Sequence, residues 1–167
     1  MATTKPFLLR FKFAGFANLP SSPGDFLYSD RVTDRRHGNV WQLQLYPGGT
    51  ALQVNANNSN NNTIVHVSAF LHNVEGPDVN AKTTFIVRDA YGNTFHRETS
   101  EDVDCYKALK ECFGYFAFVE RSVVLDEANS ILLREMLIVD VEVQTGSKPP
   151  PRRLVSKNHH ILDGNDF

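Results

Sequence analysis

The sequence has 167 residues and a formal net charge of −2 at pH 7; 41% of its residues are hydrophobic and 22% are charged. These values are typical of one globular domain with short tails, and the balanced charge argues against attraction to nucleic acid or an anionic membrane. No apolar run approaches the roughly 20 residues that span a bilayer, no apolar stretch near Met1 indicates a signal peptide, and two cysteines cannot build a disulfide framework, so we expect a reduced compartment, cytoplasmic and/or nuclear.

Three strands are predicted in the first half of the chain, because apolar and polar residues alternate there with a period of two. The alternating stretches are residues 7–13, 41–46 and 65–71. Residues 18–39 are polar and interrupted by proline and glycine, and predict a loop with one short strand near 26–29. Residues 55–62 contain six asparagines and predict a solvated hairpin tip.

The second half continues this pattern. Residues 83–88 and 94–97 flank the turn sequence at 90–93 and predict a β-hairpin, and residues 137–143 predict a closing strand. Seven or eight short strands with one or two short helical turns predict an all-β, antiparallel β-sandwich.

The helical turns are expected at 103–111 and 125–132. The N-terminal tail is expected at 1–6 and the domain at 7–145. Residues 146–167 contain the run Lys148-Pro-Pro-Pro-Arg152-Arg153 and predict an extended linker that leads out of the domain. A nuclear-import signal is an alternative interpretation of these basic residues.

The motifs of catalysis and cofactor binding are absent from the sequence. It contains no Gly-rich nucleotide loop, no G-x-S-x-G elbow, no H-E-x-x-H and no C-x-x-C. Cys105 and Cys112 are seven residues apart, which does not fit a structural zinc site. We therefore expect no enzyme activity, no cofactor and no metal.

Four segments, in chain order, resemble the MATH domain, the meprin and TRAF homology module. They lie at 11–16, 41–49, 112–119 and 124–129. The second matches the family's W-x-L-x-L-x-P-x-G pattern, and the third, Cys-Phe-Gly-Tyr, stands where the family has D-W-G-F. The fourth is similar to the L-D-E-A-N loop of the speckle-type BTB/MATH adaptors. The resemblance covers about residues 7–145 and implies an eight-stranded antiparallel sandwich.

In that branch the MATH domain binds short extended peptides of substrate proteins, and a BTB domain docks a cullin. The resemblance thus implies a substrate-recognition module of a cullin-RING ubiquitin ligase. The cullin would bind only through a BTB domain outside this chain, and we expect this part of the protein to be a monomer.

The family's peptide groove is carried over residue by residue. Its Trp, Gly and Phe fall on Phe113, Gly114 and Tyr115. Strand parity predicts that Phe113 and Tyr115 face a ligand while Phe116 and Phe118 fill the core, and a glycine permits close backbone approach. The remaining groove positions fall on Ser68, Thr83, Tyr106 (or Cys105 with a shift of one residue) and Glu111.

Other interpretations stay open. Phe113 and Tyr115 are also explained by plain packing within the sandwich, and Ser68 and Thr83 by ordinary strand surface. The targeting MATH domain of a deubiquitinating protease and a TRAF-type signalling adaptor are the alternative functions. The latter is expected to form trimers through a coiled coil before the sandwich.

Overall fold

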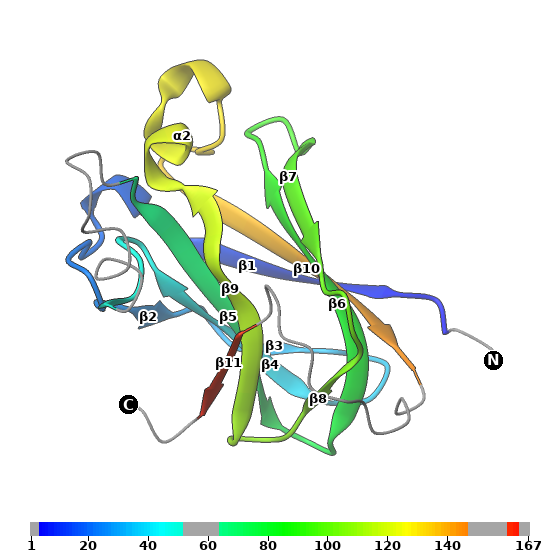
Figure 1. Ribbon diagram of the computed structural model, residues 1–167. Helices are drawn as coiled ribbons and strands as arrows, with labels where there is room; N and C mark the ends of the chain where they lie inside the picture. The colour runs from blue at the N-terminus through cyan, green and yellow to red at the C-terminus, as the bar shows by residue number, and fades with distance from the viewer. Residues whose placement is uncertain (1–3, 52–63, 147–159, 164–167) are drawn as a thin grey trace.

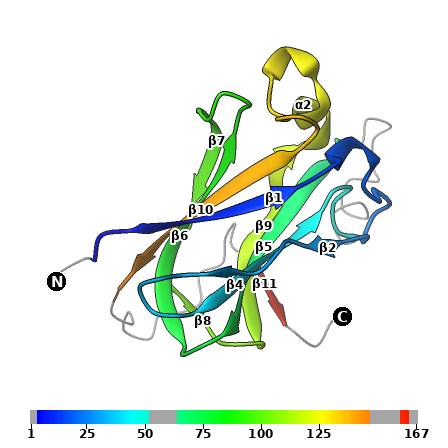
Figure 2. The ribbon, with the colours of Figure 1, turned by 180° about the vertical axis from the view of Figure 1, so that it is seen from behind.

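The computed structural model describes residues 4–51, 64–146 and 160–163. In these ranges two antiparallel sheets pack face to face (Figure 1). The first, called the β1 sheet, has the order β1-β10-β6-β7, with β8 also paired to β6. Its strands are β1 (Phe7–Phe13), β6 (Val79–Arg88), β7 (Thr94–Thr99), β8 (Asp104–Tyr106) and β10 (Leu137–Thr145). Figure 2 shows β1 and β10 side by side from behind.

The second sheet, called the β9 sheet, has the order β11-β9-β5-β4-β2, and β3 also pairs with β4. Its strands are β2 (Leu27–Tyr28), β3 (Val32–Thr33), β4 (Val40–Tyr46), β5 (His66–Glu75), β9 (Glu111–Glu120) and β11 (His160–Asp163). Seven of the described strands have six residues or more. The predicted antiparallel β-sandwich is confirmed, as are the hairpin of β6 with β7 and the closing strand β10.

The helical segments are short and differ in part from the prediction. They are η1 (Phe16–Asn18), α2 (Arg121–Leu125) and η2 (Glu127–Asn129). The helical turn expected at 103–111 is wrong, because β8 pairs there with the edge of β6 and places Tyr106 in the core. This pairing satisfies backbone groups that a short helix would leave unpaired on β6.

The core lies between the two sheets. Trp41 is fully buried, and its Nε1 donates a hydrogen bond to Asp34 Oδ2 at 2.8 Å. Phe11 and Phe13, which share one face of the alternating stretch at 7–13, are also buried. An indole N–H needs a partner once it leaves water, and Asp34 supplies that partner inside the sandwich.

A bulge in β9 changes which of its aromatic side chains face the core. Val67 pairs with Val119, but Ala69 pairs with Tyr115, so β9 contributes extra residues between these two pairs. A bulge re-aims the side chains that follow it. Phe118 therefore lies in the core, whereas Phe116 packs on the opposite face of the sheet. The prediction that Phe116 fills the core is wrong, and the prediction for Phe118 is confirmed.

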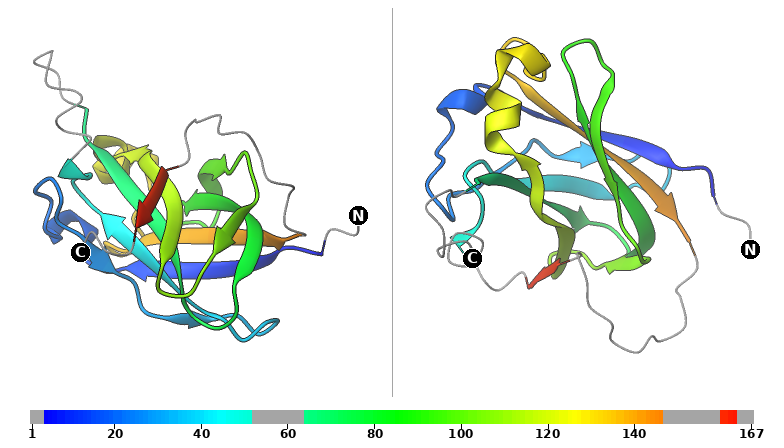
Figure 3. Two further views of the ribbon diagram at one scale, coloured as in Figure 1. Left: turned by 60° about the horizontal axis from the view of Figure 1, so that its bottom comes forward. Right: turned by 45° about the horizontal axis from the view of Figure 1, so that its top comes forward.

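The C-terminal segment returns to the sandwich. The sequence predicts that the chain leads away from the domain after residue 145, but His160–Asp163 form β11 and pair with β9 (Figure 3). Residues 147–159 and the predicted hairpin tip at 55–62 lie outside the described residues. In the part of the chain that is described, no helix is long and apolar enough to cross a membrane.

Candidate functional site

The outer edge of β9 is the feature to which the sequence-based site points. One side of β9 pairs with β5, and the other side is the edge of the sheet. There β11 pairs with the first four residues of β9, in the register His160↔Gly114, Ile161↔Phe113, Leu162↔Cys112 and Asp163↔Glu111. Within the described ranges, residues 115–120 of β9 have no strand on this side. Edge strands present backbone N–H and C=O groups that accept a further strand.

Four of the predicted groove residues come together on the inner face of the sandwich. Thr83 Oγ1 lies 3.1 Å from Tyr106 Oη, and the rings of Tyr106 and Phe113 are 4.9 Å apart. The ring of Tyr115 lies against that of Phe85 at 5.2 Å. Thr83 and Tyr106 are fully buried, and Phe113 and Tyr115 are only 4% and 8% exposed. The structure thus joins these positions, but as interior packing beneath β9 and not as open pocket walls.

The remaining predicted positions lie elsewhere. Ser68 is buried on the other face of the sheet, where its hydroxyl donates to the Phe116 carbonyl oxygen at 2.5 Å beside the bulge. Glu111 is half-buried at the start of β9. A Cβ at Gly114 would lie 1.9 Å from the Ala69 carbonyl oxygen, so the close approach that this glycine permits is that of β5. Cys105, the alternative to Tyr106, is half-buried on β8.

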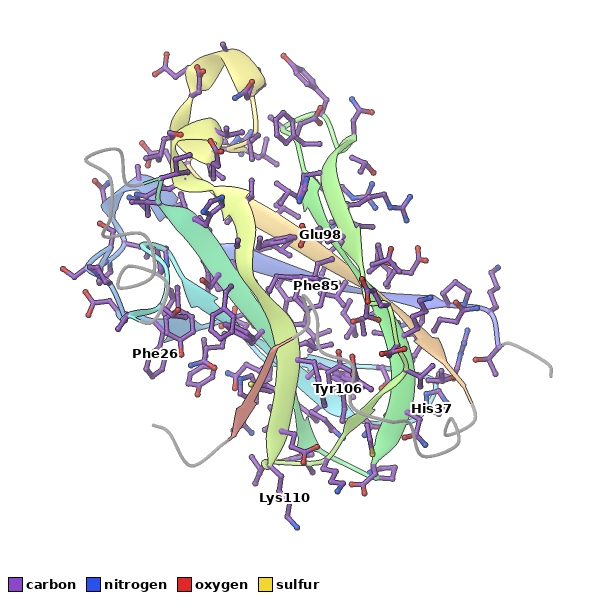
Figure 4. The ribbon with its side chains drawn as sticks, in the orientation of Figure 1. Phe26, His37, Phe85, Glu98, Tyr106 and Lys110 are labelled. Carbon is purple, nitrogen blue, oxygen red and sulfur yellow. The ribbon has the colours of Figure 1, made fainter. Side chains whose placement is uncertain are left out.

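A cleft that the sequence does not predict opens between β7 and residues 117–120 of β9. Its volume is about 280 Å³. It is lined by His66, Phe95, His96, Glu98, Ala117, Phe118, Val119, Glu120 and Val123. Figure 4 shows Glu98 and Phe85 in the space between β9 and the β6–β7 hairpin. The sequence feature that could have indicated the cleft is the pair His96 and Glu98, two titratable residues on one face of the edge strand β7.

Several polar atoms of this cleft are buried without a hydrogen bond. They are His66 Nδ1, His96 Nε2 and Glu98 Oε2, none of which has such a partner among the described residues. His96 Nε2 lies 3.7 Å from Glu98 Oε1, which is too far for a hydrogen bond. Buried polar atoms in native proteins are nearly always satisfied, so a group of three around one cleft calls for an explanation.

Burial shifts the pKa values of Glu98 and His96 in the cleft. It raises the pKa of Glu98 to about 7. It also lowers the pKa of His96, against the opposing effect of a hydrogen bond with the backbone of Phe118. The pKa of Tyr115 is raised, first by burial and then by the charges of Glu98, Asp104 and Glu101. Glu98, Asp104 and Glu101 therefore place negative charge near the Tyr115 hydroxyl.

An aromatic cluster covers the outer face of the β9 sheet. The ring of Phe26 lies 5.4 Å from that of Tyr46, and the ring of Phe70 lies 5.1 Å from that of Phe116. His72 lies at its margin, where Nε2 is 2.8 Å from Gln44 Oε1 and burial lowers the pKa of His72 to about 4. This imidazole is neutral at pH 7 and contributes packing rather than charge.

Comparison with known proteins gives a likeness of fold. No protein-family model matches the chain, and no curated protein matches it. Among solved structures the chain is similar to TRAF5 of Notothenia coriiceps, with a TM-score of 0.51 and 12% identity over 89% of this chain and 77% of that one. The sandwich therefore has a TRAF/MATH-like fold.

Proposed function

We propose that this domain is a non-enzymatic protein-interaction module that binds an extended peptide by adding it as a strand to the outer edge of β9. The observation that carries the proposal is β11: four residues of the chain itself pair with Glu111–Gly114 in antiparallel register. An edge that pairs with one extended segment offers the same backbone groups to another. Main-chain hydrogen bonds then supply affinity, and nearby side chains supply selectivity.

The burial of the aromatic positions defines how such a site would work. Phe113 and Tyr115 pack beneath β9 and support the strand, so a ligand would meet the β9 backbone and the rim of the edge. Glu111 lies at that rim. The family's preference for Ser/Thr-rich peptides depends on aromatic walls that are replaced here at Ser68 and Thr83.

The finer assignment follows the sequence resemblance. We propose residues 7–145 as a MATH domain of the speckle-type adaptor branch, and 146–167 as the connection to a BTB domain through which a cullin binds. The support is the Leu-Asp-Glu-Ala-Asn segment at 125–129, which ends α2 and forms η2. Asp126 caps η2, with its Oδ1 accepting from the Ala128 N–H at 3.0 Å, and Asn129 Nδ2 donates to the Val123 carbonyl at 3.0 Å. The residues that follow 167 in the gene test this assignment directly.

The role of the β9 edge is tested with variants of the full chain in which β11 no longer pairs with β9. The double variant Ile161→Pro/Leu162→Pro removes the N–H groups of two neighbouring residues. Successive N–H groups of a strand point to opposite sides, so one of the two lost groups faces β9, and proline does not fit a paired strand. We expect amides of Glu111–Gly114 that face β11 to exchange hydrogen at least tenfold faster, while amides that face β5 are unchanged. Ile161→Val/Leu162→Val keeps the N–H groups and is the control.

Peptide selection from a random display library then measures binding to the same proteins. A peptide selected on the proline variant should bind the wild-type chain about threefold or more weakly, because β11 competes for the edge at a high effective concentration. The bound peptide should shift the amide resonances of β9. Selected peptides that shift only other strands would contradict the proposal.

The likeness to TRAF5 favours a second candidate, a TRAF-type signalling adaptor. Sedimentation of the full-length protein distinguishes the two. A stable trimer would support the signalling adaptor, and a BTB-mediated dimer would support the ligase adaptor.

A further inference from the structure

The direction of β11 determines where a longer bound segment would go. Because β11 is antiparallel to β9 and places His160 opposite Gly114, residues that precede the paired segment in a partner run toward residues 115–120 of β9. A strand advances about 3.3 Å per residue. A side chain roughly three to six positions before the residue opposite Gly114 would therefore reach residues 117–120 of β9, which line the cleft.

The lining of the cleft is suited to a basic side chain. Glu98 and Glu120 carry its formal negative charges, and no lysine or arginine is among the described residues that line it. The side chain of Glu98 is 32% exposed although its Oε2 is buried, so a head group in the cleft reaches this oxygen after a small rotation of the carboxylate. Phe95, Phe118 and Val123 provide apolar surface for the methylene stem of a long side chain.

Two of the unsatisfied atoms of the cleft, Glu98 Oε2 and His96 Nε2, are acceptors. Glu98 Oε2 accepts hydrogen bonds when it is ionised. His96 forms a hydrogen bond with the backbone of Phe118, and because Nε2 is unbonded, the donor is Nδ1 and the acceptor is the carbonyl. In the neutral ring, Nε2 then carries no proton and is an acceptor. A lysine or arginine head group carries several donors and no acceptor, and therefore matches both atoms.

We propose that the cleft between β7 and β9 binds a lysine or arginine of the partner peptide, placed a few residues before the segment that pairs with Glu111–Gly114. The inference rests on the proposed function, since it assigns a side-chain pocket to a peptide that is already held by β9. It defines the partner as an extended segment with a basic residue on its N-terminal side. An acidic residue at the same position would meet Glu98 and Glu120 and be rejected.

The probe is a fluorescein-labelled synthetic peptide with the sequence of residues 154–163, in which a lysine precedes the histidine corresponding to His160 by three positions. Three versions carry lysine, glutamine or glutamate at that position. The protein is the full chain with Ile161→Pro/Leu162→Pro, which opens the edge. Fluorescence anisotropy at low salt measures each dissociation constant.

We expect the lysine peptide to bind about tenfold more tightly than the glutamate peptide, with glutamine between them. Adding Glu98→Gln should remove most of this preference. Glu75→Gln makes the same change of charge on an exposed residue at the far end of β5 and should leave the preference intact.

The outcomes separate the two proposals. If all three peptides bind equally and Glu98→Gln has no effect, the cleft does not select a basic residue, while strand addition at β9 stands. If none of the peptides binds the opened edge, both the inference and the proposed function are overturned.

Discussion

Two regions of the molecule hold carboxylates away from water, and they satisfy those carboxylates very differently. On the outer face of the β1 sheet, Asp140 is fully buried and accepts hydrogen bonds from Arg10 Nε and Nη2 at 2.8 and 2.9 Å and from Arg88 Nε at 2.9 Å. In the cleft beside β9, Glu98 Oε2 is buried and has no hydrogen bond within the described ranges. A structural charge is paired on all sides, whereas the cleft retains acceptors for a group that is supplied from outside.

The pKa values express the same difference. Burial alone would raise the pKa of Asp140, but the hydrogen bonds and charges of Arg10 and Arg88 outweigh it and hold this pKa below its ordinary value of 3.8. Burial of Glu98 is not offset in this way, and its pKa rises to about 7. The carboxylate is the stable form in the first region, and the neutral acid is favoured up to nearly neutral pH in the second.

The largest expected effect is the loss of the Asp140 network. Asp140→Ala removes the acceptor of three hydrogen bonds and leaves Arg10 and Arg88 facing each other. Because the Arg10 side chain is 48% exposed and that of Arg88 20% exposed, solvent partly compensates, and we expect a loss of about 2 kcal/mol in the free energy of unfolding at pH 7. Urea denaturation measures it. Glu142→Ala, two residues along the same strand, is the control.

The free energy of unfolding at low pH tests the same network. A lowered pKa stabilises the fold above the unfolded value of about 3.8, and this stabilisation is lost as the pH falls through the folded value. The wild-type protein should therefore approach the stability of Asp140→Ala as the pH falls from 3.8 through the lower, folded value. A difference that persists undiminished at pH 2 would mean that the charge of Asp140 is not the source of the effect.

A smaller effect of opposite pH dependence is expected at Glu98. Its pKa is raised, so the stability associated with the protonated form is present below about pH 4.5 and is lost as the pH rises through about 7. Glu98→Gln should be about 1 kcal/mol more stable than the wild type at pH 8, after allowance for solvent exposure, and equal to it at pH 4. Thermal unfolding at the two pH values tests this. Destabilisation at pH 8 would show that the ionised Glu98 is satisfied within the fold.

The smallest expected effect tests how much hydrogen-bond geometry, apart from charge, contributes to the Asp140 network. Arg88→Lys keeps the charge but loses the Nε donor to Asp140 and the Nη1 donor to Thr94 Oγ1 at 2.9 Å. An ammonium group on a flexible stem replaces the planar guanidinium poorly. We expect a loss of about 0.5–1 kcal/mol by urea denaturation, clearly less than for Asp140→Ala. An equal loss in the two variants would mean that the hydrogen-bond geometry, and not the buried charge, dominates.

The candidate site was predictable in part. Sequence resemblance brought Thr83, Tyr106, Phe113 and Tyr115 together, and the structure places these four side chains beside one another. It did not predict their depth, because strand parity is a local property and burial depends on how the opposite sheet packs. The cleft of His96 and Glu98 was missed for the same reason: β7 and β9 belong to different sheets, and their edges become neighbours only when the sandwich closes.

The alternating pattern was sufficient to predict β1, β4, β5, the β6–β7 hairpin and β10, and from them the antiparallel sandwich. Three further features depend on how the folded sheets meet. They are the bulge that sends Phe116 and Phe118 to opposite faces, the strand at Asp104–Tyr106 and the return of His160–Asp163 to β9. The physical reason is common to all three. An alternating pattern specifies which side chains need burial, but backbone groups pair with whatever strand edge the folded sheets leave open.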